Sequence, residues 1–475
     1  GRGEEKKIQA TTEAFEKAMA FAASRKPDTF IIASPHSVMY ADYFHISPDT
    51  WAEGDFRQFR ARDVRIRAGY DAELVHELCA LCDRKAFPAG TMGERDPKLD
   101  HGTMIPLYFL NRHLDPSAYR IVRIGLSGLP LEDHYRLGQL IREAAERLGR
   151  RVFFIASGDL SHKLKEDGPY GFDENGPAYD DRIMDVMGRA QFDELLDFDE
   201  TFCDRAAECG HRSFVMMAGA LDGTAVRAHR LSHEGTFGVG YGICTYEVTG
   251  EDEMRHFLRV WSEKKKQKLA ETRAKEDLFV RLARAGVECA VRRHRKLPEK
   301  EILEVIGAGA SAENEDVRAG ETPACAAKTA QADRDALLNR RAGVFVSIHK
   351  NGRLRGCIGT ISPTCRSIAE EIARNAVSAS TQDPRFPAIR PSELDALEIT
   401  VDVLGDTEPV SSPSELDVKR YGVIVTKGRR RGLLLPNLEG VDTVREQIEI
   451  ALQKAGLDTD EENYSLERFE VVRHY

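Results

Sequence analysis

Residues 29–36 read Thr-Phe-Ile-Ile-Ala-Ser-Pro-His, and residues 152–162 read Val-Phe-Phe-Ile-Ala-Ser-Gly-Asp-Leu-Ser-His. Each stretch opens on a short apolar run, which is typical of a strand that is buried on both faces of a parallel sheet. Around them, helical patterns alternate with further apolar runs as far as about Thr249. This alternation predicts an α/β first domain, a mostly parallel sheet covered by helices.

Polar residues follow both of these runs. His36 comes just after the first, and Ser157-Gly158-Asp159 follow the second. In an open α/β sheet, ligands bind outside the carboxyl ends of parallel strands. His36 and Asp159 are therefore candidate site residues, and His101 and His162 stand in similar settings beside small or acidic residues.

A second domain follows a charged, helix-prone segment. From about residue 336, strand patterns and helix patterns alternate again, and Lys350-Asn351-Gly352 between two apolar runs predicts a hairpin. We expect a first domain at 1–250, a connecting helix at 251–275 and a smaller α+β domain at 276–475. Within the last, about 306–335 is rich in Ala, Gly, Glu and Thr, so we expect a disordered loop there.

The composition argues against a nucleic-acid-binding protein and a membrane protein. The 475 residues carry a net charge of −10, which argues against nucleic-acid binding. No run of 18 apolar residues predicts a membrane span, and no signal peptide is evident, so we expect a cytoplasmic protein. The nine cysteines include one close pair, Cys79 and Cys82, in an apolar helical pattern, where packed thiols are favoured over a zinc or redox pair.

Some of these residues suit a mononuclear iron(II) site. Such a site uses two neutral imidazoles and a carboxylate and leaves positions open for substrate and dioxygen. A nearby histidine can accept a proton from a substrate hydroxyl. His36, His162, Glu208 and Cys209 could supply most of this set.

The motifs, taken in order, resemble a family. They are Ser34-Pro35-His36, Asp100-His101-Gly102, residues 157–162 and Cys209-Gly210-His211-Arg212. Over about residues 10–249 this set resembles the Memo proteins and the class III extradiol dioxygenase B-subunit superfamily. The resemblance implies a metal at His36 with Glu208 or Cys209, only one of these two neighbours being expected to bind. It implies His162 as base, Asp159 as an orienting residue and His101 as a pocket residue.

The expected metal is iron(II), with zinc or another divalent ion as the alternative. In the family, a further metal histidine lies in a Pro-His context on a strand upstream of the first helix. This chain begins at that helix, with Gly1 and no methionine. We therefore expect either a truncated chain or an incomplete site. The missing methionine favours truncation, and a truncated chain should bind metal weakly or not at all.

A second resemblance covers about residues 276–475. Leu354-Arg355-Gly356-Cys357-Ile358-Gly359, with Asp383-Pro384-Arg385-Phe386 downstream, resembles the AMMECR1 domain. The guanidinium of Arg355 has planar N–H donors that can bind a carboxylate or a phosphate. Because Arg355 lies inside an apolar strand, its charge needs such a partner. Cys357 is either a nucleophile or a small packed residue, and Arg385 either pairs locally or reaches the Arg355 region. We take these three as candidates for binding a substrate or a partner.

Together the two resemblances match the A and B components of the AmmeMemoRadiSam system, which implies a separate radical S-adenosylmethionine (radical SAM) partner. No C-x-x-x-C-x-x-C motif occurs in this chain. The expected function is an iron(II)-dependent, dioxygenase-like oxidoreductase acting on a small aromatic or heteroaromatic substrate. The alternative is a non-enzymatic metal-binding scaffold that docks the partner. The sequence assigns no oligomeric state.

Overall fold

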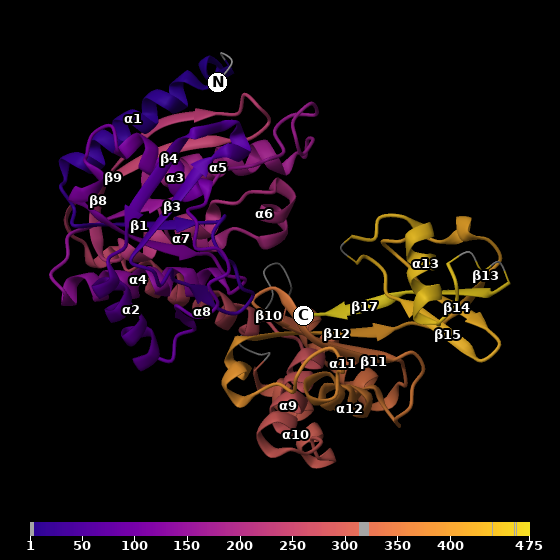
Figure 1. The fold of residues 1–475 in the computed structure, drawn as a ribbon. Coiled ribbons are helices and arrows are strands. Elements are labelled where there is room, and N and C mark those ends of the chain that lie inside the picture. The colour runs from indigo at the N-terminus through magenta and orange to yellow at the C-terminus, as the bar shows by residue number, and fades with distance from the viewer. Residues whose placement is uncertain (1–3, 313–322, 439, 460, 462) are drawn as a thin grey trace. The chain divides into compact units, whose positions relative to one another are not determined.

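The computed structural model describes residues 4–312, 323–438, 440–459, 461 and 463–475 (Figure 1). The chain forms two compact units, Gly1–Lys264 and Lys265–Tyr475. The boundary falls within helix α8 (Phe257–Ala274), in the segment expected as a connecting helix. Among the described residues, no helix has both the length and the apolar character needed to cross a membrane.

Three parallel strands form the centre of unit 1, in the order β6-β1-β7. They are β1 (Thr29–Ser34), β6 (Arg120–Gly125) and β7 (Val152–Ala156). All six residues of β1 are buried, because helices cover both faces of the sheet. The α/β prediction for the first domain is confirmed.

The side chains of β1 alternate between two apolar cores. Ile31 and Ala33 pack in a core with residues of α2 (Ala72–Arg84) and α4 (Leu131–Arg147). Phe30 and Ile32 pack in a core with residues of α1 (Gln9–Ser24) and α3 (His101–Leu110). Two-sided burial explains why the strand is a continuous apolar run. The helices of unit 1 before α8 are α1 (Gln9–Ser24), α2 (Ala72–Arg84), α3 (His101–Leu110), α4 (Leu131–Arg147), α5 (Asn175–Arg189), α6 (Glu200–Ala206) and α7 (His211–Ala220).

The remaining strands of unit 1 form separate pairs. The largest is the antiparallel hairpin of β8 (Thr224–Glu234) and β9 (Tyr241–Glu251). The others are β2 (Phe44–His45) with β5 (Ala89–Gly90), and β3 (Trp51–Phe56) with β4 (Ala61–Gly69). In the part of the chain that is described, β7 pairs only with β1 and β9 pairs only with β8.

Unit 2 contains two four-stranded antiparallel sheets, in the orders β11-β10-β12-β17 and β13-β16-β14-β15. The α+β prediction for this smaller domain is confirmed. Its strands are β10 (Val344–Lys350), β11 (Arg353–Thr360), β12 (Leu397–Leu404), β13 (Glu408–Val410), β14 (Gly422–Lys427), β15 (Arg430–Leu434), β16 (Ser465–Phe469) and β17 (Val471–His474).

The helices of unit 2 differ from the sequence prediction in one segment. They are α9 (Leu278–Arg293), α10 (Glu299–Ala312), α11 (Pro323–Asn339), α12 (Ile368–Thr381) and α13 (Val444–Lys454). The loop expected at about 306–335 is instead helical at both ends, in α10 and α11. Its middle, 313–322, lies outside the described residues.

Candidate functional site

The candidate residues gather where β1 and β7 end. Because the two strands are parallel, their carboxyl ends lie at the same edge of the sheet. The Ser34 hydroxyl donates to Asp100 Oδ1 at 2.6 Å, and the Ser157 hydroxyl donates to the Gly102 carbonyl at 2.7 Å. These two bonds fix the start of α3, which carries His101, against both strand ends.

Two turns meet at this edge. Gly158 has φ of +152°, and a side chain there would collide with the backbone of Gly210. The Gly210 amide donates to the Asp159 carbonyl at 3.0 Å, and the Asp159 amide donates to Cys209 Sγ at 3.2 Å. The close contact of the turns therefore brings Asp159 and Cys209 together, although 50 residues separate them.

Asp159, His162 and Cys209 form a cluster of metal-ligand type. One donor atom from each lies within 4.8 Å of the others. His162 Nε2 is 3.9 Å from Cys209 Sγ and 3.4 Å from Asp159 Oδ2. A catalytic relay would use both ring nitrogens of the histidine, one toward the carboxylate and one toward the thiol. Here both groups approach the same nitrogen, so the three atoms converge as metal ligands do.

The protonation states fit that interpretation. Burial, together with the charge of Asp159, raises the pKa of the Cys209 thiol to about 12, so the thiol is protonated unless a cation stabilises the thiolate. Binding of a metal to Cys209 would therefore release a proton. Burial and the neighbouring His101 lower the pKa of His36, which favours the neutral imidazole that a ligand or a base requires.

His36 and His101 form a second group at the same edge. Their ring centroids are 3.9 Å apart, and His101 Nδ1 lies 3.2 Å from Gln58 Nε2. The ring of Phe59 packs edge-on against His101. Neither histidine belongs to the cluster of Asp159, His162 and Cys209.

Glu208 has a different environment from its neighbour Cys209. Its Oε2 accepts the backbone N–H of His211 at 2.6 Å, at the amino end of α7. Burial raises the pKa of this carboxyl to about 7. Of the two neighbours considered as ligands, the structure places Cys209, and not Glu208, beside Asp159 and His162.

The other motif residues of unit 1 have packing roles. His211 is buried, with Nε2 2.9 Å from the Leu195 carbonyl, and burial lowers the pKa of its imidazole to about 4. Cys79 and Cys82 both lie on α2, and burial raises the pKa of each thiol, for Cys82 to about 12. These environments suit neutral packed side chains.

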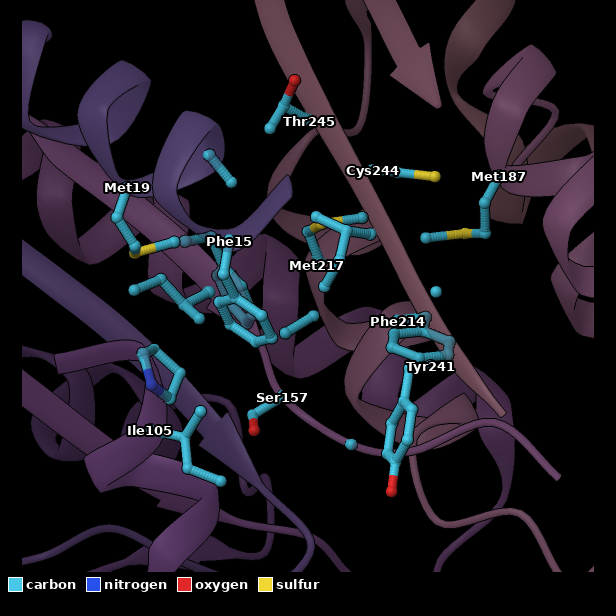
Figure 2. Close-up of a pocket in the computed structure, with 18 of the residues that line it drawn as sticks. Phe15, Met19, Ile105, Ser157, Met187, Phe214, Met217, Tyr241, Cys244 and Thr245 are labelled. Carbon is cyan, nitrogen blue, oxygen red and sulfur yellow. The ribbon is translucent and has the colours of Figure 1, made fainter. Parts of the chain in front are cut away.

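A cavity of about 690 Å³ adjoins the candidate site (Figure 2). His36, His101 and Asp159 line part of it, and apolar side chains line most of the remainder. In Figure 2, Ser157 and Tyr241 appear with apolar residues of several elements around the same space. The candidate site is therefore continuous with a large apolar cavity.

Two residues that support the site were not among those predicted from the sequence. Arg123 in β6 is buried; it donates to Ser47 Oγ at 2.7 Å and lies 3.8 Å from Asp100 Oδ2. The sequence does point to Arg123, because an arginine within an apolar strand needs a hydrogen-bonding partner, just as Arg355 does. Tyr170 stacks on His162 at 4.9 Å between ring centroids, and no sequence pattern pointed to this contact.

In unit 2, Arg355 is held by a carboxylate. Its Nε and Nη2 lie 3.2 and 3.1 Å from the two Glu393 carboxylate oxygens, and Nη1 donates to the Pro387 carbonyl at 2.8 Å. Lys350 also bonds Glu393, at 3.0 Å. Arg355 therefore has the partner that its place in an apolar strand predicted.

Cys357 and Arg385 share a second carboxylate, that of Asp383. The Cys357 amide donates to Asp383 Oδ2 at 2.9 Å, and Arg385 forms two bonds to the same carboxylate at 3.0 and 2.7 Å. Arg385 also donates to the Cys357 carbonyl at 2.9 Å, and Ser347 Oγ lies 3.2 Å from Cys357 Sγ. Arg385 is thus paired locally and reaches Cys357.

Comparison with known proteins gives two family matches and a full-length relative. The family model for the catalytic LigB subunit of aromatic ring-opening dioxygenase matches residues 1–244, and that for AMMECR1 matches residues 311–474. A protein of Clostridium acetobutylicum is 38% identical over 482 residues, covering 100% of this chain and 95% of that protein. A protein of Thermotoga maritima is 56% identical over 139 residues, which cover 29% of this chain and 80% of that protein.

Two solved structures of uncharacterized proteins are also similar. The one from Pyrococcus horikoshii is 26% identical, covers 42% of this chain and 91% of that chain, and has a TM-score of 0.32. The one from Escherichia coli is 14% identical, covers 49% and 91%, and has a TM-score of 0.36. On the family matches and the full-length relative, this chain belongs to the family of the catalytic LigB subunit of aromatic ring-opening dioxygenase, fused to a C-terminal AMMECR1 domain.

Proposed function

We propose that unit 1 binds iron(II) and is an oxidoreductase of the dioxygenase type that acts on a small aromatic or heteroaromatic substrate. The observation that carries the proposal is the convergence of Asp159 Oδ2, His162 Nε2 and Cys209 Sγ at the carboxyl end of the parallel sheet. Family membership supports the reaction class.

The donor set suits a divalent transition metal. An imidazole, a carboxylate and a thiolate together fit iron(II) or zinc better than magnesium or calcium, which prefer oxygen ligands alone. Asp159, His162 and Cys209 would hold the ion. When bound, iron(II) would supply a Lewis acid and a redox centre for the substrate.

The neighbouring residues would handle the substrate. His36 is kept neutral by burial and by His101, so its imidazole can accept a hydroxyl proton. The apolar side chains that line most of the cavity favour a planar aromatic ligand. In this proposal His162 is a ligand and His36 is the base, which exchanges the roles expected from the sequence.

Anaerobic iron(II) titration by calorimetry tests the ligand set. We expect His162→Ala and Cys209→Ala each to weaken binding by about tenfold or more, and Glu208→Gln to leave it unchanged. Cys365→Ala in unit 2 is the matched cysteine control. Equal affinity in the wild type, His162→Ala and Cys209→Ala would refute the ligand set.

Turnover separates the enzyme from a metal-binding scaffold. We expect the iron-loaded chain to consume dioxygen with a catechol and His36→Ala to do so at least about 100-fold more slowly, with iron affinity retained. Iron binding without turnover of any aromatic substrate in a broad screen would favour the scaffold.

We further propose that unit 2 contacts a radical SAM protein. Arg385 supports this, because its side chain is 53% exposed and its guanidinium is held in one orientation by hydrogen bonds to Asp383. We expect Arg385→Ala to weaken binding of that protein, measured by calorimetry, and Arg374→Ala, a matched change on α12, to leave it unchanged. Unaltered binding in Arg385→Ala would remove this residue from the interface.

A further inference from the structure

Unit 2 contains a half-buried cysteine, Cys357, whose thiol has polar neighbours. Cys357 lies on β11, opposite Ser347 on β10, and the Ser347 hydroxyl donates to Cys357 Sγ at 3.2 Å. Such a donor stabilises the thiolate form of a cysteine. By contrast, Cys289 on α9 is buried in the apolar core of the same unit, where a thiol is a small packed group. The surroundings of Cys357 therefore differ from those of a packing residue.

Two cations lie beside this thiol. The Arg385 guanidinium donates from Nη2 to the Cys357 carbonyl at 2.9 Å. Asp383 raises the pKa of this guanidinium, and Cys357 raises it further. Lys454, the last residue of α13, has Cys357 and Arg385 as its charged neighbours. A hydroxyl, a guanidinium and an ammonium thus approach one thiol from three separate elements.

The charges around the thiol do not balance. Asp383 is ionised, because Arg385 holds the pKa of its carboxyl at about 2, and this carboxylate compensates one of the two cations. In the part of unit 2 that the structure describes, no carboxylate is among the charged neighbours of Lys454. One positive charge is therefore left over, and a thiolate at Cys357 would neutralise it.

Lys454 and Arg385 suit two steps of a reaction at this thiol. Partial burial lowers the pKa of the Lys454 ammonium; Cys357 acts against this shift, and Arg385 adds to it. A lysine with a lowered pKa can accept the proton of a neighbouring thiol. Arg385 bonds oxygen atoms through Nε and Nη2, whereas its Nη1 donates to no oxygen atom of the described residues. Since this side chain is 53% exposed, Nη1 can donate to a bound ligand.

We propose that Cys357 is the nucleophile of an acyl-transfer site in unit 2, which takes an activated acyl group such as a thioester or an ester. Lys454 takes the thiol proton, and the sulfur forms a bond to the acyl carbon while the electron pair of the carbonyl bond moves to the oxygen. Arg385 Nη1 and the Lys454 ammonium stabilise that negative oxygen. The carbonyl re-forms as the bond to the leaving group breaks, and the leaving group takes that electron pair and the proton from Lys454.

The charges favour an acyl group over a free anion as the ligand. The positive charge that is left over neutralises the thiolate before the attack and the carbonyl oxygen after it, so the net charge of the site stays the same along the reaction. A carboxylate ligand would instead add a second negative charge beside the thiolate. None of these steps depends on the iron site proposed for unit 1 or on the partner contact proposed for unit 2.

Reaction of the full chain with p-nitrophenyl acetate tests the proposal. We expect a burst of about one equivalent of p-nitrophenolate per chain, with the acetyl group on Cys357 in peptide mass spectra. Cys357→Ala should lose the burst. Cys365→Ala, which removes another half-buried cysteine of the same unit, should retain it. No burst in the wild type, or acetylation only at other residues, would overturn the proposal.

Two lysine variants test the base. We expect Lys454→Gln to slow the burst by about tenfold or more, because the thiol loses both its base and its counterion. Lys419→Gln, a change at an exposed lysine elsewhere in unit 2, should leave the rate unchanged. Circular dichroism verifies that both variants fold. The same rate in the wild type and in Lys454→Gln would remove Lys454 from the site.

Alkylation by iodoacetamide separates acyl transfer from simple thiol reactivity. Because alkylation forms no negative oxygen, we expect Arg385→Gln to slow acetylation of Cys357 at least about fivefold more than it slows alkylation. Equal slowing of the two reactions would leave Cys357 as a reactive thiol and would overturn the acyl-transfer role. If Arg385→Gln does not fold, the burst in the wild type and its loss in Cys357→Ala still decide.

Discussion

Arg123 is among the largest fully buried side chains of the described residues, at 1% exposure. Its guanidinium donates to Ser47 Oγ, to the carbonyls of Lys98 and Asp96, and toward the Glu94 carboxylate. A buried charge is tolerated only when it is fully paired. This network fixes the segment that leads into the start of α3.

Removal of the Arg123 side chain should therefore destabilise unit 1. We expect Arg123→Ala to lower its unfolding free energy by about 3–5 kcal/mol, because the partner groups lose their donor. Trp51 and Trp261, the two tryptophans of the chain, both lie in unit 1, so tryptophan fluorescence during urea unfolding reports on this unit. Arg120→Ala, on the same strand but exposed, is the control and should change little; equal effects would contradict the argument.

Glu393 gives unit 2 a pH dependence. Burial alone would raise the pKa of this carboxyl, but Arg355, the Arg390 amide and Lys350 hold the pKa at about 2. Since this pKa lies below the ordinary value of 4.5, the ionised carboxylate stabilises the fold at neutral pH. That stabilisation is lost as the pH falls from about 4.5 toward 2.

We expect unit 2 to lose on the order of 2 kcal/mol of stability through Glu393 between pH 6 and pH 3. Glu393→Gln should be less stable at pH 6 and should show a shallower dependence on pH. Deuterium exchange of the β12 amides, read as an opening free energy, measures both effects. A wild type and a variant with the same slope would show that other groups dominate.

For individual residues, the sequence predicted which motifs lie together. It did not predict which of two adjacent residues, Glu208 or Cys209, lies beside Asp159 and His162. Asp159, His162 and Cys209 were all named as candidates and lie together. The choice between Glu208 and Cys209 depended on the amino end of α7, where the Glu208 carboxylate accepts the His211 N–H. The directions of the Glu208 and Cys209 side chains depend on the backbone conformation just before α7. The identities of the two residues alone do not determine that conformation.

At the scale of one element, α12 depends on a buried carboxylate. Glu371 is fully buried and accepts bonds from Thr360 Oγ, from the Thr364 amide and hydroxyl, and from the Cys365 amide. These bonds tie the first turn of α12 to the end of β11 and to the loop that follows it.

We expect Glu371→Ala to lower the unfolding free energy of unit 2 by about 3 kcal/mol, because several buried donors lose their acceptor at once. The neighbouring Glu370 pairs with Arg366 at the surface, so Glu370→Ala should cost well under half as much. Urea unfolding followed by far-ultraviolet circular dichroism measures the difference. Similar losses in the two variants would contradict the role assigned to Glu371.

Elements with a strong apolar pattern were predicted well. Residues 397–404 alternate between apolar and polar side chains at first and then become continuously apolar apart from Asp402, and they form strand β12. Residues 465–474, by contrast, are divided between β16 and β17. The chain passes from one sheet to the other near Glu470, and the apolar pattern of the sequence does not show such a change of sheet. The helical ends of 306–335 were not predicted, because the segment has few large apolar residues and was therefore expected to be a loop. Alanine, which is frequent there, has the highest helix propensity. Proline also suits the first position of a helix, where Pro323 lies in α11.

Each of the two units of the chain has its own apolar cores. We therefore expect the chain 265–475, expressed alone, to unfold cooperatively in urea, with a midpoint within about 10–15% of that of unit 2 in the full chain. Far-ultraviolet circular dichroism of the fragment and deuterium exchange of the full chain provide the comparison. A broad transition or a clearly lower midpoint would show that unit 2 needs unit 1 to fold.

The last strands of unit 2 complete both of its sheets: β16 lies between β13 and β14 in one, and β17 is an edge strand beside β12 in the other. His474 Nδ1 lies 2.6 Å from Asp277 Oδ2 at the start of α9, across a sequence separation of 197 residues. During translation, neither sheet can be completed until residues 465–475 have left the ribosome. Until then the growing chain has unpaired backbone groups on β12 and β14, the strands that β17 and β16 will pair with. Ribosomes that stall shortly before this point would release products with two exposed edges, which are natural substrates for chaperones and proteases.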